Sequence, residues 1–382
     1  MARYRWTILA LGTGAQTAYS AVFLGIPVLA PALQQEYELT LTQVGLAIAA
    51  ANAGSVFTLL AWGLLADRVG ERVVLAVGLA GCGVGLFVAA FAPSFAVLVL
   101  ALTLGGASGA SVNAASGRAV MSWFGRDERG FALGIRQTAL PIGGLLAALL
   151  LPPIEAAGGV QAGLVALAAG CLVAALAGAS GLREAPHTEG ELAGLGHPVR
   201  DPRMWRLSIG SALVLAAQIS ILSFLILFLH GERGLSTAAA AGVFALIQAL
   251  GAAARILSGR WSDRIRARIA PLRQLALGLT ATLAAAAALL SAPLPILIPV
   301  FVAAGALSLS WNGLSFTAAA ELAGRARAGA ALGFQQTALA ITSAAAPPAF
   351  AAVVEAGSWS LAYGLAAAMP VAGIAVMRHL SL

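Results

Sequence analysis

The fold of this chain is decided by one charged stretch, GLLADRVGER at residues 63–72. It separates two apolar runs, and a related stretch, GRWSDRIRAR, occurs in the second half of the chain at residues 259–268. Asp and Arg are costly inside lipid, so both stretches predict turns where an apolar run leaves a bilayer. A glycine one helical turn before the aspartate predicts close packing with another helix. The alternative is a plain hairpin loop.

Two further sequence similarities relate the two halves of the chain. The segment LGIRQT at 133–138 becomes LGFQQT at 332–337, and Asn113 corresponds to Asn312. The shift is 196 residues from Asp67 to Asp263 and 199 from Asn113 to Asn312. A nearly constant shift over so many residues indicates a duplicated half.

The composition is that of a membrane protein with many spans. Hydrophobic residues make up 60% of the chain, charged residues only 10%, and the mean hydropathy is +0.91. A soluble domain carries about 25% charged residues. The net charge of +7 would suggest nucleic-acid binding in a soluble protein, but the placement of the arginines gives another explanation.

Twelve apolar runs are long enough to cross a membrane, since a helix needs about 20 apolar residues to do so. The runs are 7–33, 42–66, 73–92, 95–121, 130–152, 160–182, 204–229, 237–261, 271–291, 295–319, 329–353 and 358–377. The predicted fold is therefore all-α and integral to the membrane, with twelve transmembrane helices in two six-helix bundles related by the repeat. We expect bundles at 1–182 and 204–382, joined by a polar cytoplasmic linker at 183–203.

The loop charges predict the orientation. With the N-terminus inside, nearly all loop arginines face the cytoplasm and only Arg233 lies outside. The external loops hold glutamates instead, including Glu36, Glu155 and Glu355. The basic charge is thus a topology signal, and we expect no nucleic-acid partner. All basic residues are arginine, which is typical of GC-rich bacteria, so we expect a bacterial inner (plasma) membrane with both termini cytoplasmic.

No metal, cofactor or enzyme chemistry is predicted. Cys82 and Cys171 lie inside apolar runs without a metal or redox spacing, and we interpret both as small core residues. The four histidines fall in loops or tails and are unpaired. An intramembrane enzyme would need a nucleophile with a base, or metal ligands. A sensor would need an output domain, for which the chain has no room.

Six plus six spans with parallel halves resemble the major facilitator superfamily. The stretch at 63–72 is similar to that family's loop motif but departs from it at Glu71, where a basic residue is usual. The second copy departs at Arg266, where the glycine is missing. Arg129 and Gly130, entering the fifth span, are also family-like.

The resemblance implies alternating access by rocking of the two bundles. It implies that spans 1, 4, 7 and 10 line a central cavity, and that spans 2, 5, 8 and 11 form the moving interface. The Asp67 turn would then latch the inward end, with Asp263 as its partner in the other half. The predicted gating residues are Gly63, Asp67, Arg68, Gly70, Arg72, Gly259, Asp263 and Arg264, together with Arg118.

Three arginines lie inside apolar runs, and such residues are functional candidates by default. Arg255, two turns before Asp263, is the first; its counterpart in the first half is Leu59, so the repeat does not require a charge there. Its spacing resembles span eight of the monocarboxylate and oxalate–formate branches, where an arginine binds the substrate carboxylate. The alternative is a structural arginine bonded to backbone carbonyls or a helix end.

Arg136, whose counterpart is the neutral Gln335, is the second. If Arg136 and Arg255 face one cavity, two guanidinium groups would form a bidentate site for an oxyanion. The alternative for Arg136 is an interfacial, cytoplasm-facing position. Arg118, near the inner end of its span, is interpreted as structural or gating.

Neutral polar residues in the presumed lining spans complete the predicted substrate site. They are Gln16, Tyr19, Asn113, Gln218, Trp311 and Asn312. Each can hydrogen-bond a small ligand, and Tyr and Trp add an apolar face. The alternative is hydrogen bonding between helices in lipid, towards which the repeat-matched Asn113 and Asn312 lean.

The resulting prediction is a secondary or facilitative transporter for a small, carboxylate-like organic anion. No run carries Asp, Glu or His away from its ends, so we expect exchange, uniport, or symport in which a proton travels with the substrate. The expected partners are the substrate, the lipid bilayer, and a proton or counter-substrate, with a monomeric carrier. The alternative is a proton-coupled exporter of neutral or zwitterionic drugs.

Overall fold

The computed structural model describes residues 4–124, 128–183, 200–323 and 328–380. Within these ranges the chain forms helices joined by short connections and no strand, which confirms the all-α prediction. Most of the predicted linker, residues 184–199, lies outside the described part of the chain. The side chain of Asp67 is also outside it, so nothing is concluded about that residue's contacts.

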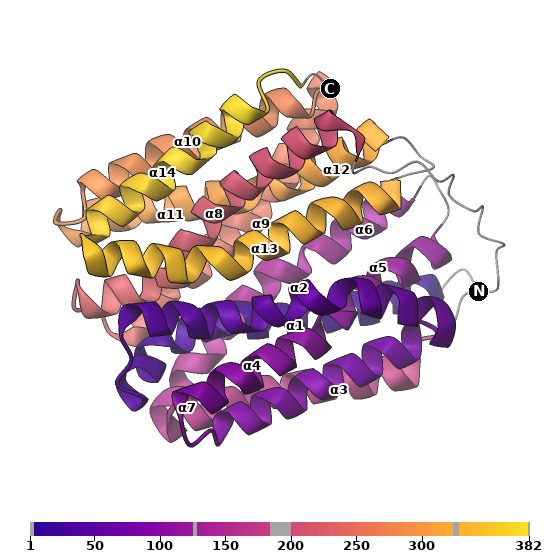
Figure 1. Ribbon diagram of the computed structural model, residues 1–382, viewed down its shortest axis with the longest axis horizontal. Helices are drawn as coiled ribbons and strands as arrows, with labels where there is room; N and C mark the ends of the chain where they lie inside the picture. Colours follow the sequence, from indigo (N-terminus) through magenta and orange to yellow (C-terminus); the bar gives the residue numbers. More distant parts are fainter. Residues whose placement is uncertain (1–3, 125–127, 184–199, 324–327, 381–382) are drawn as a thin grey trace. The chain divides into compact units, whose positions relative to one another are not determined.

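The first half of the chain contains seven helices within the described ranges (Figure 1). They are α1 (Tyr4–Glu36), α2 (Leu41–Val69), α3 (Glu71–Ala90), α4 (Phe95–Gly109), α5 (Ser111–Trp123), α6 (Arg129–Gln137) and α7 (Ala139–Gly181). The second half contains seven more. They are α8 (Pro202–Gly231), α9 (Thr237–Ile265), α10 (Ile269–Ala288), α11 (Leu294–Ser310), α12 (Asn312–Ala323), α13 (Ala328–Ala356) and α14 (Trp359–Val376).

Eleven helical stretches of the described chain are long and apolar enough to cross a membrane. The longest, Ala132–Gly181, has 50 residues and is interrupted at Gly158 and Gly159. Gly159 has a φ of 69°, in the left-handed region that glycine adopts without strain. Counting the two arms of this stretch separately gives the twelve predicted spans.

The chain divides into two compact units. The first contains residues 1–189 and 226–245, and the second contains residues 190–225 and 246–382. In the first unit α1 packs along α7 and α5, and α3 lies against α4 and α7 (Figure 1). In the second unit α10 packs against α11 and α14, and α12 against α13.

Spans four and ten are each broken in the middle. Ala110 separates α4 from α5, and Trp311 separates α11 from α12. A break frees backbone carbonyl groups that lipid cannot hydrogen-bond, so side chains of neighbouring helices must supply the donors. The functional candidates cluster around these two breaks.

The internal repeat is visible in the packing as well as in the sequence. In the first unit Gly106 lies against the backbone of Ala51, and in the second unit Gly305 lies against Ile247. These pairs are related by the same shifts, 199 residues for the glycines and 196 for their partners. The repeat therefore pairs residues of the first half with structural counterparts in the second half. The counterpart of Arg255 is Leu59.

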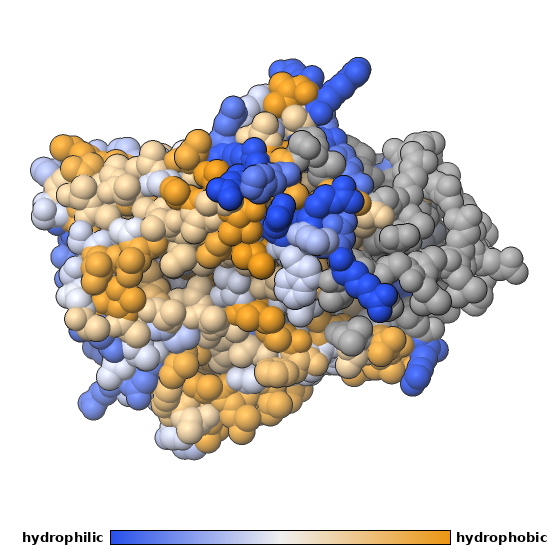
Figure 2. Space-filling model, turned by 45° about the horizontal axis from the view of Figure 1, so that its top comes forward, coloured by the Kyte–Doolittle hydropathy of each residue, from blue (hydrophilic) through white to orange (hydrophobic). Residues whose placement is uncertain are grey.

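The outer surface is apolar, as expected for a protein that lipid surrounds. Hydrophobic residues cover much of the coloured face in Figure 2, beside a smaller region of hydrophilic ones. Phe57 is 83% exposed and Leu176 70%, values that a water-soluble surface would avoid over many neighbouring positions. The polar side chains that matter for function must therefore be sought inside the units.

Candidate functional site

Arg136 lies at the end of α6, next to the turn that starts α7, and is only 8% exposed. Its Nε donates a hydrogen bond to Ser116 Oγ over 2.8 Å. Its Nη2 donates to Gln16 Oε1 at 2.9 Å and to the backbone carbonyl of Asn113 at 3.3 Å. Helices α1, α5 and α6 thus hold the guanidinium in one orientation, and the structure brings three predicted site residues together.

The charge of Arg136 is held by neutral acceptors alone. Among the residues that the structure describes, no carboxylate lies within ion-pair distance of it, and its Nη1 makes no hydrogen bond. A buried charge without a counter-ion is unfavourable by several kcal/mol in most proteins. A guanidinium that is oriented, buried and not neutralised is suited to bind an anion.

The second unit repeats this arrangement without the charge. Gln335, the counterpart of Arg136, is fully buried, and its Nε2 donates to Ser315 Oγ at 2.6 Å. Ser315 is in turn the counterpart of Ser116 and forms a 2.5 Å hydrogen bond with Ser211. The same helix contact is therefore made by arginine in one unit and by glutamine in the other.

Arg255 in α9 reaches the break between α11 and α12. Its Nε donates to the carbonyl of Leu309 at 3.0 Å, and its Nη2 donates to Asn312 Oδ1 at 3.0 Å. Ser258, one turn further, donates to the carbonyl of Ser310 at 2.7 Å. The half-buried arginine therefore stabilises the break, which is the structural alternative considered for it; a role in substrate binding stays a prediction.

The remaining predicted lining residues form hydrogen bonds with other residues of the protein. Tyr19 is buried, and its hydroxyl donates to the carbonyl of Gly106 at 3.3 Å. The Trp311 indole donates to Gln218 Oε1 at 3.0 Å, and both side chains are almost completely buried. Asn312 lies with Arg255 in the second unit, whereas Gln16 and Asn113 lie with Arg136 in the first.

Arg118 forms an ion pair with Glu71, with 2.8 Å between Nε and Oε1. Glu71 is the first residue of α3, where the helix dipole favours a negative charge, and its side chain is only 12% exposed. The departure of Glu71 from the family's loop motif thus has a physical reason, since α5 presents an arginine to it. The pair joins α3 to α5 within one unit, which agrees with the structural side of the interpretation of Arg118.

We expect Glu71→Arg to lower the unfolding temperature in detergent by several degrees, because two guanidinium groups would then face each other. Reversing the pair, with Glu71→Arg and Arg118→Glu together, should recover part of the loss. Recovery is incomplete because an arginine at the start of α3 opposes the helix dipole. A double-mutant cycle should give a coupling of about 1–2 kcal/mol; zero coupling would show that the pair contributes nothing.

The duplicated turns differ from the expectation in one respect. A Cβ added at Gly63 or Gly259 would meet no atom within 4 Å, so the predicted close helix contact at these glycines is wrong for the described residues. The close approaches lie deeper in the spans, at Gly54 and Gly106, where helices cross backbone to backbone. Gly70, with a φ of 85°, does need to be glycine, because it separates α2 from α3.

The charged residues of the turns are bonded within their own units. Asp263 accepts a hydrogen bond from Arg268 at 2.5 Å, and Arg268 also pairs with Glu321 at 3.0 Å. Partial burial lowers the pKa of Arg268, but the hydrogen bonds to Asp263 and Glu321 outweigh it and raise that pKa. Arg72 donates to the carbonyl of Ala179, whereas Arg68 and Arg264 are exposed. The latch between the Asp67 turn and Asp263 remains a prediction.

The two cysteines are not isolated from each other, although the sequence showed no pairing. Cys82 Sγ and Cys171 Sγ lie 3.9 Å apart, both buried and both free thiols. They fill the contact between α3 and α7, which agrees with a core role. Among the described residues no group of three or more His, Cys, Asp or Glu could hold a metal ion.

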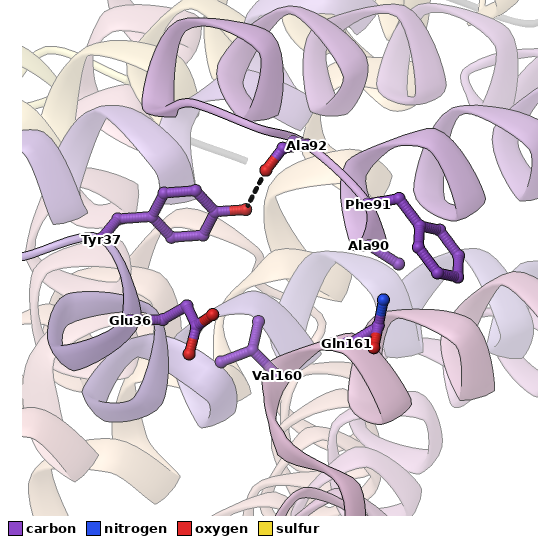
Figure 3. A pocket seen from close by; sticks show the side chains of 7 residues that line it. All are labelled: Glu36, Tyr37, Ala90, Phe91, Ala92, Val160 and Gln161. Atoms are coloured by element: carbon purple, nitrogen blue, oxygen red, sulfur yellow. Dashed lines mark hydrogen bonds between the residues drawn. The ribbon is translucent and has the colours of Figure 1, made fainter.

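A pocket in the first unit lies away from the arginines, at the ends of α1 and α3 and beside the kink of α7 (Figure 3). Tyr37 points across it and donates to the carbonyl of Ala92 at 2.9 Å. Burial and then the charge of Glu36 raise the pKa of Tyr37, so the phenol stays protonated and can donate. None of the predicted site residues lines this pocket.

Gln248 is a buried polar residue that was not among the sequence-based candidates. Gln248 in α9 is fully buried, and neither its Nε2 nor its Oε1 has a hydrogen-bond partner in the described structure. An unsatisfied buried amide costs about 1–3 kcal/mol per group. The repeat offered a signal, since the counterpart of Gln248 is the amide Asn52, also buried.

Comparison with known proteins gives one family. The model of the Major Facilitator Superfamily matches residues 11–347. An uncharacterised MFS-type transporter of Mycobacterium tuberculosis is 35% identical over 97% of this chain and 84% of its own length. A protein of Cupriavidus necator named "Probable sulfoacetate transporter SauU" is 28% identical over 91% of this chain and 86% of its own length.

The fold has a counterpart among solved structures. A bacterial homologue of the human lysosomal transporter Spinster, in an inward-facing and occupied conformation, matches with a TM-score of 0.79. The match covers 98% of this chain and 95% of that one at 18% identity, so it concerns the fold alone.

Proposed function

Because this chain belongs to the Major Facilitator Superfamily and is a multi-pass membrane transporter, we propose that its cargo is a small organic anion. The observation that carries the proposal is Arg136, a buried guanidinium whose partners are neutral oxygen atoms. Such a charge attracts anions and repels cations, most strongly where water is scarce. In the second unit, Arg255 on α9 adds another positive charge, beside the break between α11 and α12.

One relative supports an anionic substrate for this transporter. SauU is named for sulfoacetate, a small molecule with two acidic groups, and it is related to this chain over most of both lengths. Carboxylates and sulfonates both present oxygen atoms that a guanidinium can bind through two parallel hydrogen bonds. The proposal therefore covers both kinds of small anion.

The proposed mechanism is alternating access by rocking of the two bundles. No apolar run carries Asp, Glu or His away from its ends, so the spans lack the usual side chains of a proton relay. We therefore propose exchange, uniport, or symport in which a proton travels with the substrate. We place the carrier in a bacterial inner membrane with both termini in the cytoplasm, on the distribution of loop arginines.

The test is uptake into proteoliposomes of labelled acetate, oxalate, succinate and sulfoacetate, with ethylammonium and glucose as cationic and neutral controls. Saturable uptake of at least one anion, and of neither control, is expected. Uptake of neutral or cationic compounds in preference to all anions would contradict the proposal and favour the drug-exporter alternative.

Arg255→Leu copies the residue that the first half has at this position, Leu59, and removes the donor to the Leu309 carbonyl. We expect anion uptake to fall at least tenfold, given that a charged hydrogen bond contributes roughly 1.5–3 kcal/mol. The matched control is Ser258→Ala, which removes an uncharged donor to the same break. If both variants lose uptake equally, Arg255 acts only by holding the break and does not bind substrate.

A further inference from the structure

Gln248 is a polar group that the fold buries without using. It is 0% exposed, and both ends of its amide lack a hydrogen-bond partner among the described residues. The neighbouring Ile247 packs against Gly305, and Gly251 packs against Leu309, so this part of α9 is in tight contact with α11. Tight packing would have favoured an apolar residue here. The presence of an amide therefore suggests a hydrogen-bond partner that is not part of the protein.

The position of Gln248 on α9 connects it to Arg255. The two residues are seven apart, which places them on the same face of the helix, about 10 Å apart along its axis. Ser258 and Ser262 continue this stripe, but their hydroxyl groups donate to the carbonyls of Ser310 and Ala267. Along this face, Gln248 is thus the polar side chain that the scaffold leaves unsatisfied.

The internal repeat points in the same direction. Asn52 in α2 is the counterpart of Gln248, as the equivalent contacts of Ala51 and Ile247 with Gly106 and Gly305 show. Both halves therefore carry a buried amide at this position. The next polar position of the stripe differs, since Arg255 corresponds to Leu59.

We infer that Gln248 is a specificity-determining residue, which hydrogen-bonds a second polar group of a substrate whose anionic end is held by arginine. This inference rests on the proposed function. An amide both donates and accepts, so its best partner is a group that does the same, such as a hydroxyl or a protonated acid. The favoured substrates are small anions with a second hydrogen-bonding group, and simple monocarboxylates are poor ones.

The test compares anions that differ by one hydroxyl group: glycolate with acetate, and lactate with propionate. The wild type should prefer the hydroxylated anion of each pair by roughly tenfold or more, because a site built around a hydroxyl rejects the analogue that lacks it. In Gln248→Leu the preference should fall to within about twofold, through a higher KM for the hydroxylated anion, with acetate uptake little changed.

A matched variant separates this role from a structural one. Gln335→Leu removes an equally buried glutamine that is bonded to Ser315, so it should lower the unfolding temperature. Gln248→Leu should leave that temperature unchanged or raise it, because an unsatisfied amide is lost.

Three results would overturn the inference. The first is a wild type without preference within the pairs, and the second is a preference that survives in Gln248→Leu. The third is a loss of stability in Gln248→Leu as large as that in Gln335→Leu. If the wild type transports no anion at all, the proposed function fails first and the inference falls with it, so the two failures are distinguishable.

Discussion

Arg136→Gln is expected to lower anion uptake at least a hundredfold without unfolding the protein. The physical reason is the loss of two charged hydrogen bonds to the substrate, together roughly 3 kcal/mol, which corresponds to a factor of about a hundred. The fold should tolerate the change because the second unit already has glutamine at this position. Gln335 there bonds Ser315, the counterpart of the Ser116 that Arg136 bonds.

The measurement is initial uptake rate in proteoliposomes, beside the thermal unfolding temperature and the gel-filtration profile in detergent. Arg136→Lys serves as the second variant, since it keeps the charge but loses the planar fork of donors. Its uptake should lie between those of wild type and Arg136→Gln. Normal uptake by a well-folded Arg136→Gln protein would remove Arg136 from the substrate site.

Gly106→Ala is expected to prevent the first unit from folding, although it adds only one methyl group. A Cβ at Gly106 would overlap the backbone carbonyl of Ala51, and a backbone atom cannot move aside as the end of a side chain can. The helices α2 and α4 would have to separate, which would also displace Tyr19 from the Gly106 carbonyl. We expect little or no monodisperse protein after extraction into detergent.

The matched control is Gly170→Ala in α7. A Cβ there would meet nothing within 4 Å, and alanine favours a helix over glycine by about 1 kcal/mol. Gly170→Ala should therefore be extracted and unfold like wild type, or at a slightly higher temperature. If Gly106→Ala behaved in the same way, the close crossing of α2 and α4 would be wrong.

The architecture could be predicted because its signals are local. An apolar run of about 20 residues predicts a span wherever it occurs, and Gly158 and Gly159 mark the bend between two of them. The repeat was readable from the turns at 63–72 and 259–268, and the contacts of Gly106 and Gly305 bear it out. The family followed from the same residues.

The site was harder to predict because its contacts join distant parts of the chain. Arg255 bonds the carbonyl of Leu309, a backbone group that leaves no trace in the sequence. The breaks at Ala110 and Trp311 fall inside runs whose overall hydropathy predicts an uninterrupted span, although serine and asparagine lie beside both breaks. Glu71 departs from the family pattern. The reason is visible only in the packing of α3 against α5, which places Arg118 where it forms an ion pair with Glu71.

Gln248 was overlooked for a different reason. Its span was not among those that the family resemblance assigns to the cavity, and a single glutamine in an apolar run is usually a helix–helix contact. The missing hydrogen bonds became visible only once the neighbours of the amide were known.

The most direct test of the central claim is calorimetric titration of the purified protein in detergent with a small organic anion and with a cation of similar size. We expect the wild type to bind the anion and not the cation, and Arg136→Gln, folded to the same extent, to bind neither. Equal anion binding by the wild type and Arg136→Gln, or binding of the cation instead, would contradict it.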